Sequence, residues 1–168
     1  FMMKYGTLVY INIDGRVLMM RKATRRDDPN SGYYTLPGGK LGSNERKTPE
    51  GRLAGAVRET EEETGLRIIS PIARGVILFN NKGRIFDNWP NPEDFLVYIF
   101  ATGSYTGELR GSEEGTPVWI DEKEIPLLPK NSGDAKVYEW LKNPRSFQGV
   151  IKHKEKALDE FGTFVEYL

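Results

Sequence analysis

The stretch that decides the fold runs from Leu36 to Leu66 and reads LPGGKLGSNERKTPEGRLAGAVRETEEETGL. Its second half predicts a helix whose start and end are both marked. Thr48 suits the capping position, Pro49 suits the first helical position, and Gly65 suits the left-handed residue that closes a helix. The sequence therefore predicts a single capped helix in this stretch.

The predicted helix has an acidic face and an inward face. Glu59, Glu62 and Glu63 stand at i, i+3 and i+4, so their carboxylates cluster about one turn apart. Like charges at this spacing repel by roughly 0.2–0.5 kcal/mol per pair, so a purely structural helix gains nothing from them. A hard divalent cation would turn that repulsion into ligation, because Mg²⁺ prefers carboxylate oxygens. The inward positions are Leu53, Ala56, Val57 and Thr60.

An acidic run can also be no more than a solvated helix face. Its surroundings favour a functional interpretation here. A Pro-Gly-Gly turn precedes the helix, Arg58 stands directly before Glu59, and a Gly-Leu pair follows the last acidic turn. Glu61 differs from its neighbours, because at about 100° per residue it lies nearly opposite Glu59 on the helix. We therefore expect Glu61 to stay outside the acidic cluster.

This ordered set is similar to the Nudix box, G-x5-E-x7-R-E-U-x-E-E-x-G-U, in which U is a bulky aliphatic residue. The spacing matches at each step from the first glutamate to the end of the box. The matching residues are Glu50, Arg58, Glu59, Glu62, Glu63, Gly65 and Leu66. Thr60 stands where the family has an aliphatic residue, which is a mild change on the inward face. The box thus occupies about residues 39–66.

One departure lies before the helix. Eleven positions separate Gly39 from Glu50, where the family has six, so we expect an insertion of about five residues within 40–49. Residues 40–47 are polar and contain glycine, which is typical of a tolerated surface loop. We expect this loop to be mobile and to leave the catalytic helix intact.

The resemblance implies an α/β/α sandwich in which helices flank a mixed β-sheet, and the rest of the chain agrees with this α/β class. Residues 5–13 and 17–21 flank Asp14-Gly15, which predicts a β-hairpin. A second helix is expected over 135–141, and residues 80–83 predict a turn. Because no linker or repeat interrupts the sequence, we expect one Nudix domain over residues 1–168.

Composition narrows the function classes. The 168 residues include no cysteine, which excludes disulfides, thiol nucleophiles and thiolate zinc sites. Twenty-four basic and 24 acidic residues cancel, so no net charge favours nucleic acid or anionic lipid. No apolar run approaches a membrane span, and His153 is the only histidine, without a nucleophile-elbow sequence. We expect a cytoplasmic monomer or homodimer with neither nucleic acid nor a membrane as partner.

The resemblance also implies roles for residues. Mg²⁺, for which Mn²⁺ can substitute, would be held by the box carboxylates, a glycine carbonyl and a distant acid. This ligand set comprises Gly39, Glu59, Glu62, Glu63 and Glu114, with Glu113 as the alternative distant acid. Glu59 is the favoured general base among the three box glutamates. Arg58 would orient one of these glutamates, and Glu50 would support that network.

The substrate residues are fewer. Related enzymes that remove oxidised purine triphosphates carry a polar residue before the glycine turn, and Thr35 stands there. In the cationic segment 22–31, Arg25 is a candidate contact for substrate phosphates. The acidic pair that reads a purine edge in the mammalian-type enzymes is missing, and Asn131 or Asp134 could replace it.

Three functions follow from these residues. The first is a Mg²⁺-dependent pyrophosphohydrolase of a nucleoside triphosphate, such as an oxidised or non-standard dNTP like 8-oxo-dGTP. The second is a Nudix hydrolase of another pyrophosphate, such as a nucleotide sugar or a dinucleoside polyphosphate. The third is a Nudix-fold binding module without catalysis, against which the complete glutamate set argues.

Overall fold

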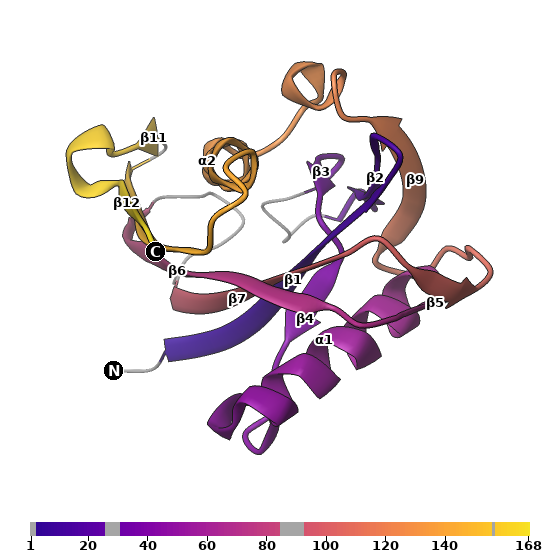
Figure 1. Cartoon of the computed structure of the whole chain (residues 1–168). Helices are drawn as coiled ribbons and strands as arrows, with labels where there is room; N and C mark the ends of the chain where they lie inside the picture. The colour runs from indigo at the N-terminus through magenta and orange to yellow at the C-terminus, as the bar shows by residue number, and fades with distance from the viewer. Residues whose placement is uncertain (1–2, 26–30, 85–92, 156) are drawn as a thin grey trace.

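The computed structural model describes residues 3–25, 31–84, 93–155 and 157–168. A twisted mixed sheet forms the middle layer, with α1 on one face and α2 on the other (Figure 1). The main sheet has the order β11-β10-β6-β7-β1-β2-β3, while β12 pairs with β10, β4 with β1 and β9 with β2. This arrangement confirms the predicted α/β/α sandwich.

Strands and short turns separate the two α-helices along the chain. The helices are α1 (Pro49–Thr64) and α2 (Ser132–Leu141), with short 3-10 turns η1 (Glu45–Lys47), η2 (Ile125–Leu127) and η3 (Glu160–Gly162). The strands are β1 (Met3–Ile13), β2 (Arg16–Lys22), β3 (Tyr34–Thr35), β4 (Gly38–Lys40), β5 (Leu66–Ile68), β6 (Ile72–Arg84), β7 (Asp94–Thr102), β8 (Tyr105–Gly107), β9 (Gly115–Asp121), β10 (Phe147–Glu155), β11 (Ala157–Leu158) and β12 (Phe164–Tyr167). Among the described residues, no helix is both long and apolar enough to cross a membrane.

Strand β1 lies in the interior of the sheet, between β7 and β2, and packs against two cores. It pairs in parallel with β7 and antiparallel with β2 and β4. Because side chains alternate along a strand, Val9 and Ile11 pack with Ala56 beneath α1, while Leu8 and Tyr10 pack on the α2 side. The predicted hairpin is confirmed, since both Asp14 and Gly15 have positive φ, at 51° and 83°.

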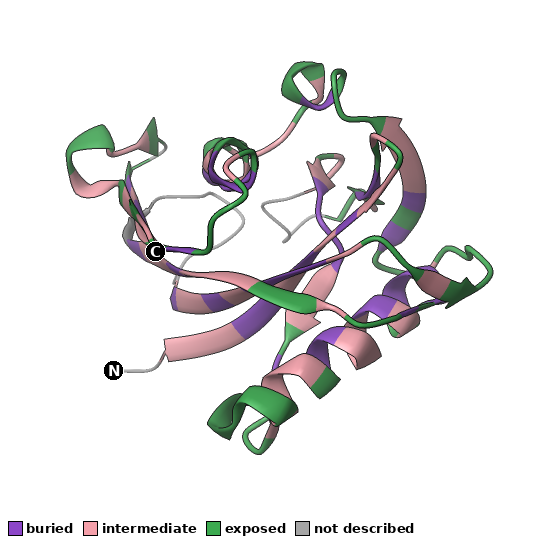
Figure 2. Cartoon of the chain, viewed as in Figure 1, coloured by how far each residue is buried: buried purple, intermediate pink, exposed green. Residues whose placement is uncertain are grey.

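Helix α1 begins and ends where the sequence indicates. The Thr48 hydroxyl accepts a hydrogen bond from the Gly51 N–H at 2.9 Å, Pro49 takes the first position, and Gly65 has a φ of 81°. The side of α1 that faces the sheet is buried, and its first turn is exposed (Figure 2). The helix therefore presents its glutamates along the border between sheet and solvent.

The turn expected at residues 80–83 is wrong. Strand β6 continues through these residues to Arg84, because β10 pairs with it from the distant C-terminal part of the chain. The Asn81 N–H also donates to the Asp94 carboxylate at 2.8 Å, which ties this end of β6 to the start of β7. Pairing with remote strands thus overrides the local turn signal of Asn and Gly.

Candidate active site

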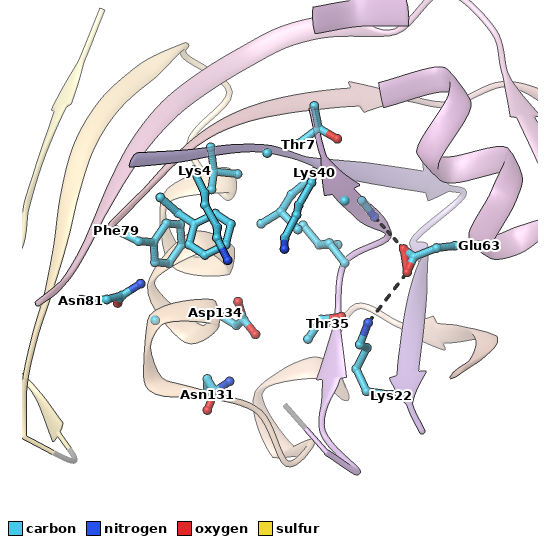
Figure 3. Close-up of a pocket in the computed structure, with 18 of the residues that line it drawn as sticks. Lys4, Thr7, Lys22, Thr35, Lys40, Glu63, Phe79, Asn81, Asn131 and Asp134 are labelled. Carbon is cyan, nitrogen blue, oxygen red and sulfur yellow. Dashed lines mark hydrogen bonds and ion pairs between the residues drawn. The ribbon is translucent and has the colours of Figure 1, made fainter. Parts of the chain in front are cut away.

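A cavity of about 480 Å³ opens between the glycine turn, β1 and the start of α2. At one end lie Glu63 and Lys22 (Figure 3). Gly38 and Gly39 line the cavity there too, since the Gly38 N–H donates to Glu63. Its other walls are mostly apolar or amide-bearing, and include Leu8, Thr35, Phe79, Asn81, Phe95, Val97, Asn131, Asp134 and His153. The cavity therefore has a charged end against α1, at Glu63 and Lys22, while Lys4, Lys40 and Asp134 bring further charges to its other walls.

The glycine turn lies directly against α1. The Gly38 N–H donates to Glu63 Oε1 at 2.9 Å. A side chain at Gly39 would collide with the Glu59 carboxylate, and one at Gly38 would collide with the Thr7 carbonyl. A Cβ at Gly38 would press on β1 and one at Gly39 on Glu59, so glycine at both positions lets the turn lie between β1 and α1.

Arg58 connects two box glutamates. Its Nη1 lies 2.9 Å from Glu59 Oε1 and 3.2 Å from Glu62 Oε2. The pKa of Glu59 is nevertheless raised, because burial of this carboxyl outweighs the hydrogen bond and charge of Arg58. A raised pKa suits a carboxylate that takes a proton from water.

The acidic partner on the other side of Arg58 is Glu45, which the sequence analysis missed. Arg58 Nε donates to Glu45 Oε2 at 2.9 Å and Nη2 donates to Oε1 at 2.8 Å. This bidentate bond lowers the pKa of Glu45 and raises that of Arg58. Glu50, to which this support was assigned, is exposed, and no contact joins it to Arg58 within the described residues. The available signal was the Gly39-x5-Glu45 spacing, which matches the start of the box.

Lys22 connects the other two predicted metal ligands. Its Nζ lies 3.9 Å from Glu63 Oε2 and 3.4 Å from Glu114 Oε2. The Glu63 side chain is only 8% exposed, and burial raises its pKa to about 7 although the Gly38 N–H and Lys22 oppose this rise. Glu113 instead offers its carbonyl to Arg25 at 2.8 Å. The geometry thus favours Glu114 over Glu113 as the acid nearest the site.

The donor set fits a hard divalent cation. Each candidate ligand offers oxygen, from the carboxylates of Glu59, Glu62, Glu63 and Glu114 and the carbonyl of Gly39. Within the described residues, no three acidic or histidine side chains already converge as a metal site. Arg58 and Lys22 hold the carboxylates in pairs instead. A cation would compensate the buried Glu63 carboxylate, whose charge is the most costly of the set.

Glu61 lies away from this cluster, as helical geometry predicts. Its carboxylate lies 3.8 Å from Arg67 Nη1, and its carbonyl accepts from the Gly65 N–H that closes the helix. The sequence-based separation of Glu61 from Glu62 and Glu63 therefore agrees with the contacts that these side chains make.

The predicted substrate residues divide into two groups. Thr35, Asn131 and Asp134 line the cavity (Figure 3). Arg25 does not line it, because its guanidinium binds the Glu113 carbonyl and the Glu114 carboxylate. Among the described residues of segment 22–31, the cation that lines the cavity is Lys22, whose side chain is 15% exposed.

Further lining residues escaped the sequence analysis. Lys4 and Lys40 extend into the cavity, and burial together with the Lys4 charge lowers the pKa of Lys40 (Figure 3). His153 is buried, with its Nδ1 3.1 Å from Asn81 Oδ1. Alternation along β1 could have placed Lys4 beside Leu8. The Asn81–His153 contact could not be foreseen, because it depends on the pairing of β6 with β10.

A family model described as the NUDIX domain matches residues 4–141. The chain belongs to the Nudix hydrolase family. It is 32% identical over 134 residues to the Nudix hydrolase YvcI of Bacillus subtilis (strain 168), covering 78% of this chain and 74% of that protein. It is 30% identical over 166 residues to the oxidized purine nucleoside triphosphate hydrolase of Danio rerio, covering 95% and 97%.

Solved structures agree with this Nudix fold. The mutator MutT protein from Bacillus halodurans superposes with a TM-score of 0.72 at 23% identity, covering 97% of this chain and 96% of that one. The likeness supports the MutT-like arrangement of sheet and helices. As a Nudix hydrolase, the protein is a pyrophosphohydrolase, from a family that generally uses divalent metal ions.

Proposed function

We propose that this Nudix hydrolase is a Mg²⁺-dependent pyrophosphohydrolase of nucleoside triphosphates, with oxidised or non-standard dNTPs as the preferred class. The observation that carries the proposal is the cavity itself. One end lies against the box glutamates, and its other end offers Phe79 and Phe95 beside polar and charged side chains. A triphosphate suits the first end and a flat, hydrogen-bonding base suits the second.

The chain's own residues account for most of the reaction. Water bonds to one phosphorus of the α–β anhydride, the bridging P–O bond breaks, and the leaving group, pyrophosphate or nucleoside monophosphate, keeps the electron pair. Glu59 receives the proton of that water, and Arg58 keeps the Glu59 carboxylate oriented. Mg²⁺, when bound by the ligand set with Mn²⁺ as a substitute, would neutralise phosphate charge and lower the pKa of water. Lys22 lies where it can contact phosphate oxygens.

The end of the cavity that would hold the base would determine which nucleotide is accepted. Thr35 is 8% exposed, and Asn131 and Asp134 line the same wall region. These polar groups can donate to and accept from the edge of a purine held against Phe79. The Danio rerio relative is named for oxidized purine nucleoside triphosphates, and it is 30% identical over nearly the full length of both chains. This likeness supports oxidised purine triphosphates as the substrate class. The proposal includes one Nudix domain over residues 1–168 and a cytoplasmic location.

A substrate panel tests the proposal. Normal dNTPs, 8-oxo-dGTP, ADP-ribose, a nucleotide sugar and a dinucleoside polyphosphate would be incubated with the protein and Mg²⁺, and all products separated by anion-exchange chromatography. We expect nucleoside monophosphate and pyrophosphate from triphosphates, with the highest kcat/KM for an oxidised purine. A higher kcat/KM for a nucleotide sugar or a dinucleoside polyphosphate would reject the triphosphate assignment. A Glu59→Gln sample prepared in parallel controls for contaminating phosphatases.

A further inference from the structure

The added residues of the box lie after Glu45. Twelve residues separate Glu45 from Arg58, five more than the seven of the family pattern, whereas Gly39 and Glu45 keep the family spacing. The extra length therefore forms the η1 turn and the start of α1, which together precede the acidic face. Of the polar surface loop expected over 40–47, residues 42–47 are exposed except for the partly buried Glu45, whereas Lys40 ends β4 and Leu41 is buried.

Two arginines dock this segment onto the sheet. Tyr5 and Tyr98 share the α1 face of the sheet, because Tyr5 and Thr7 alternate to the same side of β1 and Thr7 pairs with Tyr98. The Arg46 guanidinium lies 4.7 Å from the Tyr5 ring centroid, and that of Arg52 lies 4.5 Å from the Tyr98 centroid. Both distances are within the range of cation–π contacts.

The backbone between the two arginines is also fixed. Arg52 Nη1 donates to the Arg46 carbonyl at 3.1 Å, which joins the two docked side chains. A Cβ at Gly51 would lie 2.5 Å from the Glu45 carbonyl, so α1 lies closely against the η1 turn. The Gly42 N–H, in the segment before η1, donates to the Glu45 carboxylate at Oε1 at 2.8 Å. Glu45 is therefore held by segments before and after it.

We propose that Arg46 and Arg52 are positioning residues that dock segment 46–52 on Tyr5 and Tyr98 and thereby hold Glu45 against Arg58. Arg58 in turn contacts Glu59 and Glu62, so the docked segment sets the orientation of two candidate ligands. The catalytic consequence rests on the proposed function. The geometric consequence is a fixed Arg58 guanidinium, and it is independent of the proposed function. The added residues thus act on the chemical step rather than on the rim of the cavity.

The test compares Arg46→Met, Arg52→Met and the double variant with Lys47→Met, an exposed cation of the same segment. We expect the double variant to lose about tenfold in kcat with KM within twofold. Mutation of residues that orient metal ligands typically lowers activity by about 10–100-fold. The Mn²⁺ affinity of the double variant, measured by titration calorimetry, should fall by a similar factor. Tyr98→Phe, which keeps the ring, should retain kcat, and Tyr98→Leu should lose it.

A readout without substrate separates this inference from the proposed function. In ¹⁵N-labelled protein, the Arg58 Nε–H signal should exchange faster with water in the double variant than in Lys47→Met. If both variants show the same exchange rate and the same Mn²⁺ affinity, the positioning role is overturned, whatever substrate the enzyme accepts. If the substrate panel rejects triphosphates but the Arg58 Nε–H still exchanges faster in the double variant, only the proposed function is overturned. Should the double variant not fold, the two single variants carry the same comparison.

Discussion

Glu63 accepts a hydrogen bond from the Gly38 N–H at 2.9 Å while its side chain is almost fully buried. This contact joins the glycine turn to the last turn of α1 and places a carboxylate at the charged end of the cavity. Burial raises its pKa to about 7, so the carboxylate is costly to ionise without a compensating cation. The site is therefore built to gain stability when a cation arrives.

The raised pKa of Glu63 predicts a pH-dependent stability in the absence of metal. Below the ordinary value of 4.5, folded and unfolded chains both carry the proton. Between 4.5 and about 7 only the folded chain carries it, so the free energy of unfolding falls as pH rises. Above about pH 7 the loss is complete, on the order of 3 kcal/mol. Glu63→Gln should lack this loss and be the more stable protein at pH 8.

Urea unfolding in EDTA at pH 5 and pH 8 measures this effect. Glu61→Gln is the matched control, because Glu61 lies on the same helix beside Arg67 and outside the cluster. If Glu63→Gln and Glu61→Gln show the same change between the two pH values, Glu63 does not carry a raised pKa.

Replacing single carboxylates by glutamine should separate Glu62 from Glu61. Glu62→Gln removes a charge beside Arg58 and should lower kcat by about 10²-fold, the order expected when a metal is misplaced by one ligand. Glu61→Gln should stay within about threefold of the parent, because Glu61 pairs with Arg67 outside the cluster and such a surface ion pair contributes little. Steady-state kinetics would measure kcat of each variant, and circular dichroism would show that each variant is folded. Equal losses in both variants would mean that the register of α1 does not determine the ligands.

Metal removal should abolish turnover. Excess EDTA should reduce the rate on every substrate to background, and Mg²⁺ or Mn²⁺ in excess should restore it, because the acidic face needs a cation to bring phosphate near. The measurement is product release before and after chelation and re-addition. Full turnover in excess EDTA would reject the metal-dependent mechanism.

Local signals in the sequence predicted the parts of the fold that local contacts form. The cap at Thr48, the closure at Gly65 and the hairpin at Asp14-Gly15 are each determined within a few residues. The continuation of β6 past Asn81 was missed, because it depends on β10, about seventy residues further on. Glu45 was missed for a different reason, since the spacing was counted back from Arg58 to Glu50, and the added residues hide the match between Gly39 and Glu45.

The buried hydroxyl of Thr60 leads us to predict a stabilising substitution. Its side chain is fully buried in α1, and its hydroxyl finds no hydrogen-bond partner among the described residues. Thr60→Val keeps the shape and removes the unsatisfied group, so it should raise stability by about 1 kcal/mol. Thr64→Val is the control, because the equally buried Thr64 hydroxyl donates to the Thr60 carbonyl at 2.6 Å. That variant should lose stability in thermal unfolding, and a gain in both would point to helix propensity instead.

The last prediction distinguishes Glu45 from Glu50 as the acidic partner of Arg58. Glu45→Gln replaces one oxygen of the bidentate pair by an amide that cannot accept from the guanidinium, so Arg58 loses part of its support. We expect kcat to fall by roughly 10–100-fold with KM little changed, and Mn²⁺ affinity to fall in parallel. Glu50→Gln should stay within about twofold of the parent, because Glu50 is exposed in the first turn of α1. If Glu50→Gln is the more damaging variant, the family spacing counted from Glu50 holds functionally, and the added residues precede it.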